Sequence, residues 1–243
     1  MKSFVNQSKK NELKPWLKKC WCIPPKQNAH FVAHMEDVLD VYHRPRDERY
    51  PVVCHDEFCK QLLGEIREAQ GVQPGQPARQ DCEYVRHGSA SAFVMYAPLE
   101  GRREVFVSEK GTRTSQDYAH ALEFMATMFP SAEKIILVED NLNTHCDASL
   151  YATFSAQKAR DLANRFERHH SPKHGSWLNI AESEISALVR TGLTDRIETL
   201  DEFRQQLAAV VQRRNLSGAK TNWQFRSEDA RVKLHSIYPS LQS

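Results

Sequence analysis

Two short apolar runs that each end in an aspartate constrain the fold of this chain more than any other feature of its sequence. Residues 51–56 read PVVCHD and residues 134–140 read KIILVED. Short runs of apolar, β-branched residues are typical of strands buried on both faces of a sheet. Ligands of open α/β sheets collect just beyond the ends of such strands. We therefore expect Asp56 and Asp140 to meet at one edge of a sheet.

Strand and helix patterns alternate around these two runs. Tight turns are expected at Gly88 and at residues 100–101, where they would join the strands of an antiparallel meander. Further strands are predicted at residues 83–87, 90–97, 103–108 and 166–169, and helices at residues 31–42, 114–129, 155–164, from 177 onward and 200–211. This order favours a mixed α/β sheet flanked by helices.

Composition excludes several classes of protein. The chain has 243 residues, of which 40% are hydrophobic and 26% charged, as in ordinary globular proteins. No stretch approaches the ~20 apolar residues of a membrane span, and the N-terminus runs into lysines, so we expect a cytoplasmic protein without membrane association. The six cysteines lack zinc-ribbon spacing and are expected to be reduced thiols.

Positive charge is concentrated at the N-terminus, although the net charge is only +2. Residues 1–26 contain seven lysines and a single acidic residue, Glu12. Such a run can neutralise the phosphates of a nucleic acid. The same charges are also consistent with a solvated, partly disordered N-terminal segment that binds no partner. The charge pattern by itself leaves both open.

Glu182 is the candidate for a third acid beside Asp56 and Asp140. It lies one turn into the helix that is expected from Trp177 onward, and this helix can bring a carboxylate to the edge of the sheet. Three crowded carboxylates repel one another unless cations neutralise them. Their oxygens suit Mg²⁺ or Mn²⁺, and two such ions can support phosphodiester cleavage. Each acid could equally cap a helix or pair on the surface, and spacing alone does not decide.

Three segments together resemble a known family. Residues 51–57 (PVVCHDE), 136–145 (ILVEDNLNTH) and 171–184 (SPKHGSWLNIAESE) resemble, in this order, the acidic motifs of bacterial insertion-sequence transposases of the mariner superfamily, the insertion sequence 630 type. The resemblance runs from about Leu13 to a tail motif at residues 223–239, which is nearly the whole chain. It implies a ribonuclease-H-like fold, a mixed five-stranded sheet flanked by helices.

The resemblance also implies an activity and a site. A DDE endonuclease of this kind cuts DNA at transposon ends and transfers the strand to target DNA, with Asp56, Asp140 and Glu182 holding two Mg²⁺ or Mn²⁺ ions. Glu182 is preferred to Glu184 because the two point about 200° apart on a helix and the motif register selects the first. Further residues are expected to contact DNA, although Asn143 could instead cap the next helix: Asn143, His145, Arg168, Lys173 and His174.

The expected partners are double-stranded DNA, both transposon ends and target, and a second copy of the chain in a homodimer on DNA. The expected location is the bacterial cytoplasm, at the nucleoid. Family members carry helix-turn-helix modules before the catalytic domain. We therefore interpret residues 1–26 as a basic linker left from that missing region, residues 27–212 as the catalytic domain, and residues 213–243 as a basic tail packed on it.

Two other functions remain open from the sequence. A shortened chain could be a non-catalytic remnant that binds DNA, or one that binds transposase subunits and inhibits them. A ribonuclease-H-like enzyme acting on RNA–DNA hybrids is the third possibility. Cleavage assays distinguish all three.

Overall fold

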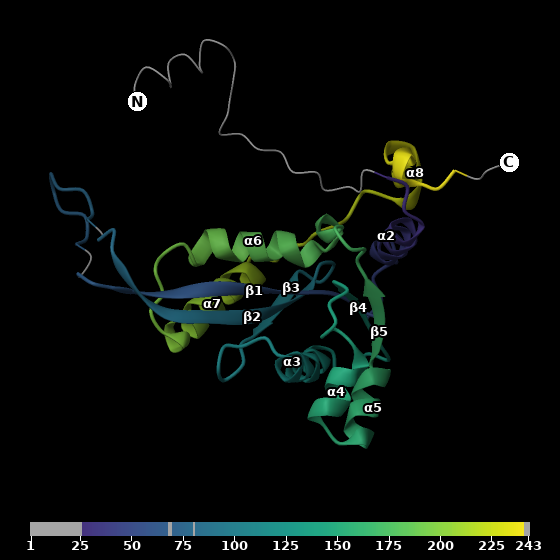
Figure 1. Ribbon diagram of the computed structural model, residues 1–243, viewed down its shortest axis with the longest axis horizontal. Coiled ribbons are helices and arrows are strands. Elements are labelled where there is room, and N and C mark those ends of the chain that lie inside the picture. The colour runs from purple at the N-terminus through teal and green to yellow at the C-terminus, as the bar shows by residue number, and fades with distance from the viewer. Residues whose placement is uncertain (1–25, 68–69, 80, 241–243) are drawn as a thin grey trace, which may run out of the picture.

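The computed structural model describes residues 26–67, 70–79 and 81–240, and its centre is a five-stranded sheet between two groups of helices (Figure 1). The strand order is β3-β2-β1-β4-β5. β1 (Val52–Glu65) pairs antiparallel with β2 (Tyr84–Ala97) and parallel with β4 (Ile135–Glu139). β3 (Arg102–Phe106) is antiparallel to β2, and β5 (Phe166–His170) is parallel to β4. The predicted mixed five-stranded sheet with flanking helices is confirmed.

β1 is longer than its sequence predicted. We expected it to end at Asp56, but it continues to Glu65, so Asp56 lies within the strand. On β1, only Val52–Cys54 pair with β4, whereas the residues from Cys54 to Glu65 pair with β2. The second half of β1 is therefore held by one neighbour in a long hairpin, whose far end projects from the helices (Figure 1). A strand supported in this way does not need the continuous apolar run that marks its first half.

Gly88 is not a turn between two strands, as the sequence predicted. It lies within β2 with a φ of 104°, opposite Leu62, where the register shifts before Leu63. Glycine adopts this conformation without steric cost, and the register shift has the character of a β-bulge. The two strands predicted at residues 83–87 and 90–97 are consequently one strand.

The helices begin and end largely where their capping residues indicate. Thr114 and Ser155, the first residues of two of the predicted helix ranges, are the N-caps of α3 and α5. Trp177 lies in a short 3-10 turn instead of opening the next helix, and that helix, α6, starts after Asn179. α4 was not predicted. The helices and 3-10 turns are α2 (Ala29–Tyr42), α3 (Ser115–Met128), α4 (Asp147–Thr153), α5 (Ala156–Asn164), η1 (Ser176–Leu178), α6 (Ile180–Gly192), α7 (Leu200–Leu216), α8 (Ser227–Lys233) and η2 (His235–Ile237).

The two faces of the sheet have different covers. Val52 and Cys54 of β1 pack in the cluster that contains α2, the start of α6 and α8, whereas Val53 packs with α3, α4 and α5. Side chains alternate along a strand, so even-numbered residues in the first half of β1 face α6 and odd-numbered ones face α3. We call these the α6 face and the α3 face. α7 packs farther along the α6 face.

The C-terminal segment packs on the rest of the chain through α8 and η2. Ala230 and Ile237 are buried in the cluster that holds α2, and Arg231 pairs with Glu36. Position 212, where we expected the catalytic domain to end, lies inside α7. The expected linker at residues 1–26 lies outside the described residues except for its last position. None of the helices in the described ranges has the length and apolar character required to span a bilayer.

Candidate active site beside the ends of β4 and α6

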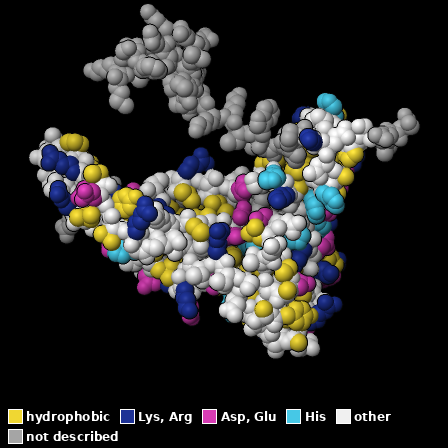
Figure 2. All heavy atoms as spheres, in the orientation of Figure 1, with side chains coloured by type: hydrophobic (Ala, Val, Ile, Leu, Met, Phe, Trp, Pro, Cys, Tyr) yellow, Lys and Arg dark blue, Asp and Glu magenta, His cyan; other side chains and the backbone are white. Residues whose placement is uncertain are grey.

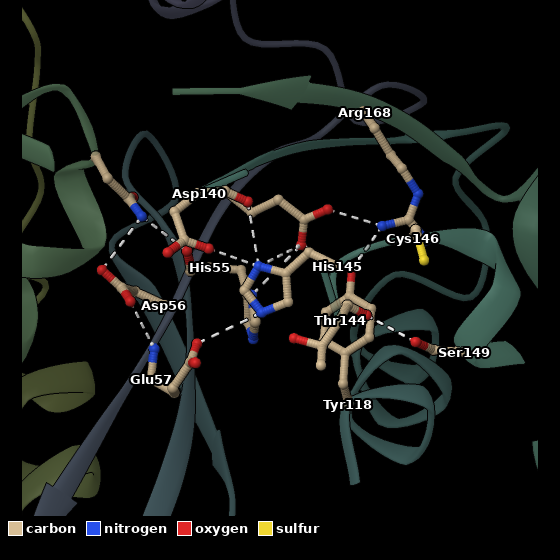
Figure 3. A network of polar contacts seen from close by, with 12 residues as sticks. His55, Asp56, Glu57, Tyr118, Asp140, Thr144, His145, Cys146, Ser149 and Arg168 are labelled. Carbon is tan, nitrogen blue, oxygen red and sulfur yellow. Dashed lines mark hydrogen bonds and ion pairs between the residues drawn. The ribbon is translucent and has the colours of Figure 1, made fainter. Parts of the chain in front are cut away.

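Asp56 and Asp140 lie next to each other on the α6 face (Figure 3). Asp56 follows Cys54 on the same face of β1, and Asp140 directly follows β4, whose Val138 packs in the α6-face cluster. Burial raises the pKa of Asp56 to about 6, and the negative charges of Glu57 and Asp140 add to the rise. A buried carboxylate that resists ionisation, with a second carboxylate beside it, forms a place for a cation.

Asn179 joins this pair to α6. The residue is buried, and its amide nitrogen donates to the carbonyl oxygen of His55 at 2.8 Å and lies 3.4 Å from a carboxylate oxygen of Asp56. Its amide oxygen accepts from the backbone of Ala181 at 3.1 Å and so caps the helix. The start of α6 is thereby fastened to β1 beside Asp56.

Glu182 stands in the first turn of α6, while Glu184 is used elsewhere. Glu184 is buried and forms ion pairs with Arg103 at 2.9 Å and with Arg214 at 2.8 Å. In the part of the chain that the structure describes, the half-buried Glu182 carboxylate makes no ion pair or hydrogen bond. Figure 2 shows acidic side chains gathered on the surface where the start of α6 approaches β4, with histidine and basic side chains near them. Glu182 therefore has a free carboxylate on the helix that Asn179 fastens beside Asp56.

A second group of polar side chains lies behind the acids, on the α3 face, and we call it the buried polar cluster. It consists of His55, Glu57, Tyr118, Glu139, His145 and Arg168 (Figure 3). Arg168 donates to one oxygen of Glu139 at 2.7 Å, and the Tyr118 hydroxyl donates to the other at 2.8 Å. Burial would raise the pKa of Glu139, but the contact with His55 and the charge of Arg168 outweigh it and hold the pKa at about 2. Glu139 is therefore ionised in the core.

His145 links the buried polar cluster to the acid pair. Its Nδ1 is 2.6 Å from Oδ1 of Asp140, its Nε2 is 3.5 Å from Glu57, and its ring stacks on Tyr118 with centroids 4.5 Å apart. Burial lowers the pKa of His145, but the carboxylates of Asp140 and Glu57 outweigh it and raise the pKa to about 10. A charged imidazole therefore supports Asp140 from the interior side.

Two of the residues expected to contact DNA, His145 and Arg168, lie largely in the interior. His145 is 3% exposed, and the Arg168 side chain is 14% exposed with its guanidinium bound to Glu139. Both side chains are committed to interior carboxylates, so their placement does not support a phosphate contact. Asn143 is exposed and does not cap α4, whose N-cap is Cys146. The remaining two expected contacts, Lys173 and His174, are exposed in the loop between β5 and η1.

The sequence analysis missed His55, Glu57, Glu139 and Asn179. A usable signal was present in residues 55–57, because a strand that carries His, Asp and Glu in succession must place the middle residue on one face and its neighbours on the other. The pair Glu139 and Asp140 repeats this pattern at the end of β4. The polar residues at 55–57 and 139–140 thus indicated two groups of side chains, one on each face of the sheet.

The two groups differ in their fitness for a metal ion. In the described ranges, the His55, Glu139 and His145 side chains offer ligand atoms within 4.8 Å of one another. Both oxygens of Glu139 are already bound by Arg168 and Tyr118, however, and a cation there would adjoin a guanidinium. The acid pair offers hard oxygen donors, and among the described residues only one oxygen of Asp140, Oδ1, is paired, with His145. The acids on the α6 face fit a divalent cation better.

A family model for the DDE superfamily endonuclease matches residues 51–204, which is more than half of the chain and includes Asp56, Asp140 and Glu182. The chain belongs to the DDE superfamily endonucleases. The matched segment of this endonuclease runs from β1 into α7 and so contains the whole sheet and α6. The prediction of an enzyme with a DDE endonuclease domain is confirmed.

Solved structures of a mariner transposase are similar to this DDE endonuclease in fold. The mariner Mos1 paired end complex with Mg matches at 16% identity with a TM-score of 0.55, covering 98% of this chain and 72% of that one. The Mos1 mariner paired end complex with Mn matches at 16% identity with a TM-score of 0.48, covering 92% and 72%. The first match confirms the expected ribonuclease-H-like fold. No curated protein matches the sequence.

Proposed function

We propose that this DDE endonuclease is the catalytic part of a DNA transposase of the mariner superfamily. Its three acidic motifs resemble those of the bacterial insertion-sequence transposases, and we propose that it is of this type. In this proposal Asp56, Asp140 and Glu182 hold divalent metal, Mg²⁺ or Mn²⁺, and act on the phosphodiester backbone of DNA. The observation that carries the proposal is the adjacency of Asp56 and Asp140 on the α6 face, with α6 fastened beside them through Asn179.

Glu182 is the third ligand in this proposal because its neighbour is unavailable. The Glu184 carboxylate is held by Arg103 and Arg214, and leaving two arginines without their partner would be costly. Glu182 has no such partner among the described residues and lies in the first turn of α6. The helix therefore offers one free carboxylate in the turn that Asn179 fastens to β1.

The roles of the side chains follow from their contacts. Two bound metal ions would supply activation of the attacking oxygen and stabilisation of the leaving one. Asp56 and Asp140 supply carboxylate oxygens, and burial beside other carboxylates raises the pKa of Asp56. His145 holds Asp140 from the interior, so the ligand is oriented before any ion binds.

The proposed partners are transposon ends and target DNA, bound by a homodimer at the bacterial nucleoid. One solved structure of similar fold is a mariner paired end complex, which supports transposon ends as the proposed partner. Exposed Lys173 and His174, in the loop that leads into η1 and α6, are the proposed phosphate contacts, together with Asn143. We retain residues 27–212 as the proposed catalytic domain and residues 213–243 as its tail.

Cleavage of supercoiled plasmid tests the proposal. Wild type with Mg²⁺ or Mn²⁺ should nick the plasmid, EDTA should stop the reaction, and Asp140→Ala should abolish it. Asp161→Ala is the matched control, because Asp161 is an exposed acid on α5 away from the site and its loss should leave the rate unchanged. Equal nicking by wild type and Asp140→Ala would refute the enzyme proposal. Preference for RNA–DNA hybrid over duplex DNA in a competition assay would replace the transposase with a hybrid-specific nuclease.

A further inference from the structure

Asn179 makes more contacts than a helix cap requires. A cap needs one acceptor for a free backbone N–H, and the Asn179 amide oxygen fills this role toward Ala181 at 3.1 Å. Serine, threonine or aspartate would serve equally well in such a position. The amide nitrogen of Asn179 is a separate group, and it donates to the carbonyl oxygen of His55 at 2.8 Å and lies 3.4 Å from Asp56.

The place where this amide binds β1 is one where the sheet needs a partner. β4 pairs with β1 as far as Cys54 and no farther, so on that side β1 loses its neighbour immediately before His55 and Asp56. Asn179 is 1% exposed, so its bond to the His55 carbonyl is shielded from water. The first turn of α6 is thereby fixed to the segment of β1 that carries the first acid.

We propose that Asn179 is a positioning residue that sets the separation between the Asp56 carboxylate and the first turn of α6, where Glu182 stands. This inference rests on the proposed function, because it assumes that Asp56 and Glu182 bind the same metal. One amide spans the two elements: its oxygen holds α6 and its nitrogen holds β1. Metal affinity then depends on the nitrogen, whereas helix stability depends on the oxygen.

Two substitutions separate the two ends of the amide. Asn179→Ser keeps an acceptor for the cap and removes the nitrogen that reaches His55 and Asp56. Asn179→Ala removes both. Asn28→Ser is the matched control, since Asn28 also caps a helix, α2, by accepting from Phe31 at 3.0 Å. This control changes a cap in the same way at a site without acidic residues of the proposed triad.

The measurements are Mn²⁺ binding to the DNA-free protein by electron paramagnetic resonance, the Mn²⁺ concentration for half-maximal plasmid nicking, and the urea midpoint of unfolding. We expect both Asn179 variants to weaken Mn²⁺ binding about tenfold, as loss of a group that orients a metal ligand does. The half-maximal Mn²⁺ concentration should rise by the same factor. The urea midpoint should fall further for Asn179→Ala than for Asn179→Ser, and Asn28→Ser should leave Mn²⁺ binding unchanged.

The outcomes distinguish this inference from the function on which it rests. If wild type nicks plasmid in an Asp140-dependent way while Asn179→Ser binds Mn²⁺ and nicks like wild type, Asn179 is a cap alone and the inference is overturned. If wild type shows no Asp140-dependent nicking, the proposed function is overturned and the inference with it. Weakened Mn²⁺ binding in both Asn179 variants, with normal binding in Asn28→Ser, supports the positioning role.

Discussion

Glu139 carries its negative charge with none of its side chain exposed, and the contacts that make this possible come from three different elements. Arg168 on β5 and Tyr118 on α3 bind its two oxygens, while His55 on β1 lies 3.5 Å away. An interior charge of this kind is tolerated only with all its partners in place. Single substitutions in the buried polar cluster should therefore act on stability before they act on catalysis.

Arg168→Met should lower the free energy of unfolding by about 3–5 kcal/mol, because it leaves Glu139 buried without its main counter-charge. Urea unfolding followed by circular dichroism measures the loss. Arg160→Met, on the exposed surface of α5, is the control and should change stability by about 0.5 kcal/mol or less. A stable Arg168→Met protein with weakened DNA binding would instead restore the original expectation of a phosphate contact.

The Cys54 thiol should not react with alkylating reagents in the folded protein. Burial raises the pKa of its thiol to about 12, and the reactive species is the thiolate. Brief alkylation at pH 8 followed by peptide mass spectrometry should modify the exposed Cys59, Cys82 and Cys146 while leaving Cys54 unmodified until urea is added. Rapid modification of Cys54 without denaturant would mean that α2 opens from the sheet in the native state.

At the scale of elements, α3 has the most complete local signal. The Thr114 hydroxyl accepts from the backbone of Asp117 at 3.2 Å, and the Asp117 carboxylate accepts from the backbone of Thr114 at 2.8 Å, which is a reciprocal capping box. Burial raises the pKa of Asp117, but hydrogen bonds from Thr112 and Thr114 outweigh it and the net shift is downward. The cap therefore works best with the carboxylate ionised.

Thr114→Ala should cost about 1 kcal/mol in the free energy of unfolding, measured in urea at pH 7. The contribution of Asp117 should depend on pH in a defined direction. A carboxyl whose folded pKa lies below its ordinary value of 3.8 stabilises the fold above pH 3.8 and loses this effect as the pH falls through the folded pKa. The stability difference between wild type and Asp117→Ala should thus shrink below pH 3.8; a constant difference would show that the charge is irrelevant.

At the scale of the whole molecule, the C-terminal segment, which contains α8 and η2, packs against α2 on the α6 face of the sheet. Its polar contacts lie at the surface. The Arg231 guanidinium donates to both carboxylate oxygens of Glu36, and the Tyr238 hydroxyl donates to one of them. Its apolar contacts are interior, because Ile237 is 1% exposed within the cluster around α2. Exposed ion pairs contribute little to stability, whereas a buried isoleucine contributes much more.

Ile237→Ala should therefore lower the free energy of unfolding by about 2–5 kcal/mol, and Arg231→Ala should change it little. Urea unfolding ranks the two variants, and limited trypsin digestion should release the C-terminal segment first from Ile237→Ala. The reverse ranking would show that the ion pair with Glu36, and not the apolar contact, holds this segment in place.

Local patterns predicted much of the sheet and several helices, because their causes lie within a few residues. The apolar run of β4 and the starts of the helices near Thr114 and Ser155 are examples. The predictions failed where a distant partner decides the structure. β1 continues past Asp56 because β2 pairs with it, and Gly88 stays in β2 because a bulge absorbs it.

The sequence by itself determined the alternation of strands and helices and the order of the three acidic motifs, and the register of the third motif led to the proposal of Glu182 rather than Glu184 as a ligand. Tertiary structure decided which polar residues meet. His145 belongs to the second acidic motif and Arg168 to the basic residues that precede the Glu182 helix, which favoured DNA contacts at the surface. Both side chains instead lie inside, where they pair with Glu57 and Glu139. Burial of a charge depends on partners from other strands, and no local pattern contains that information.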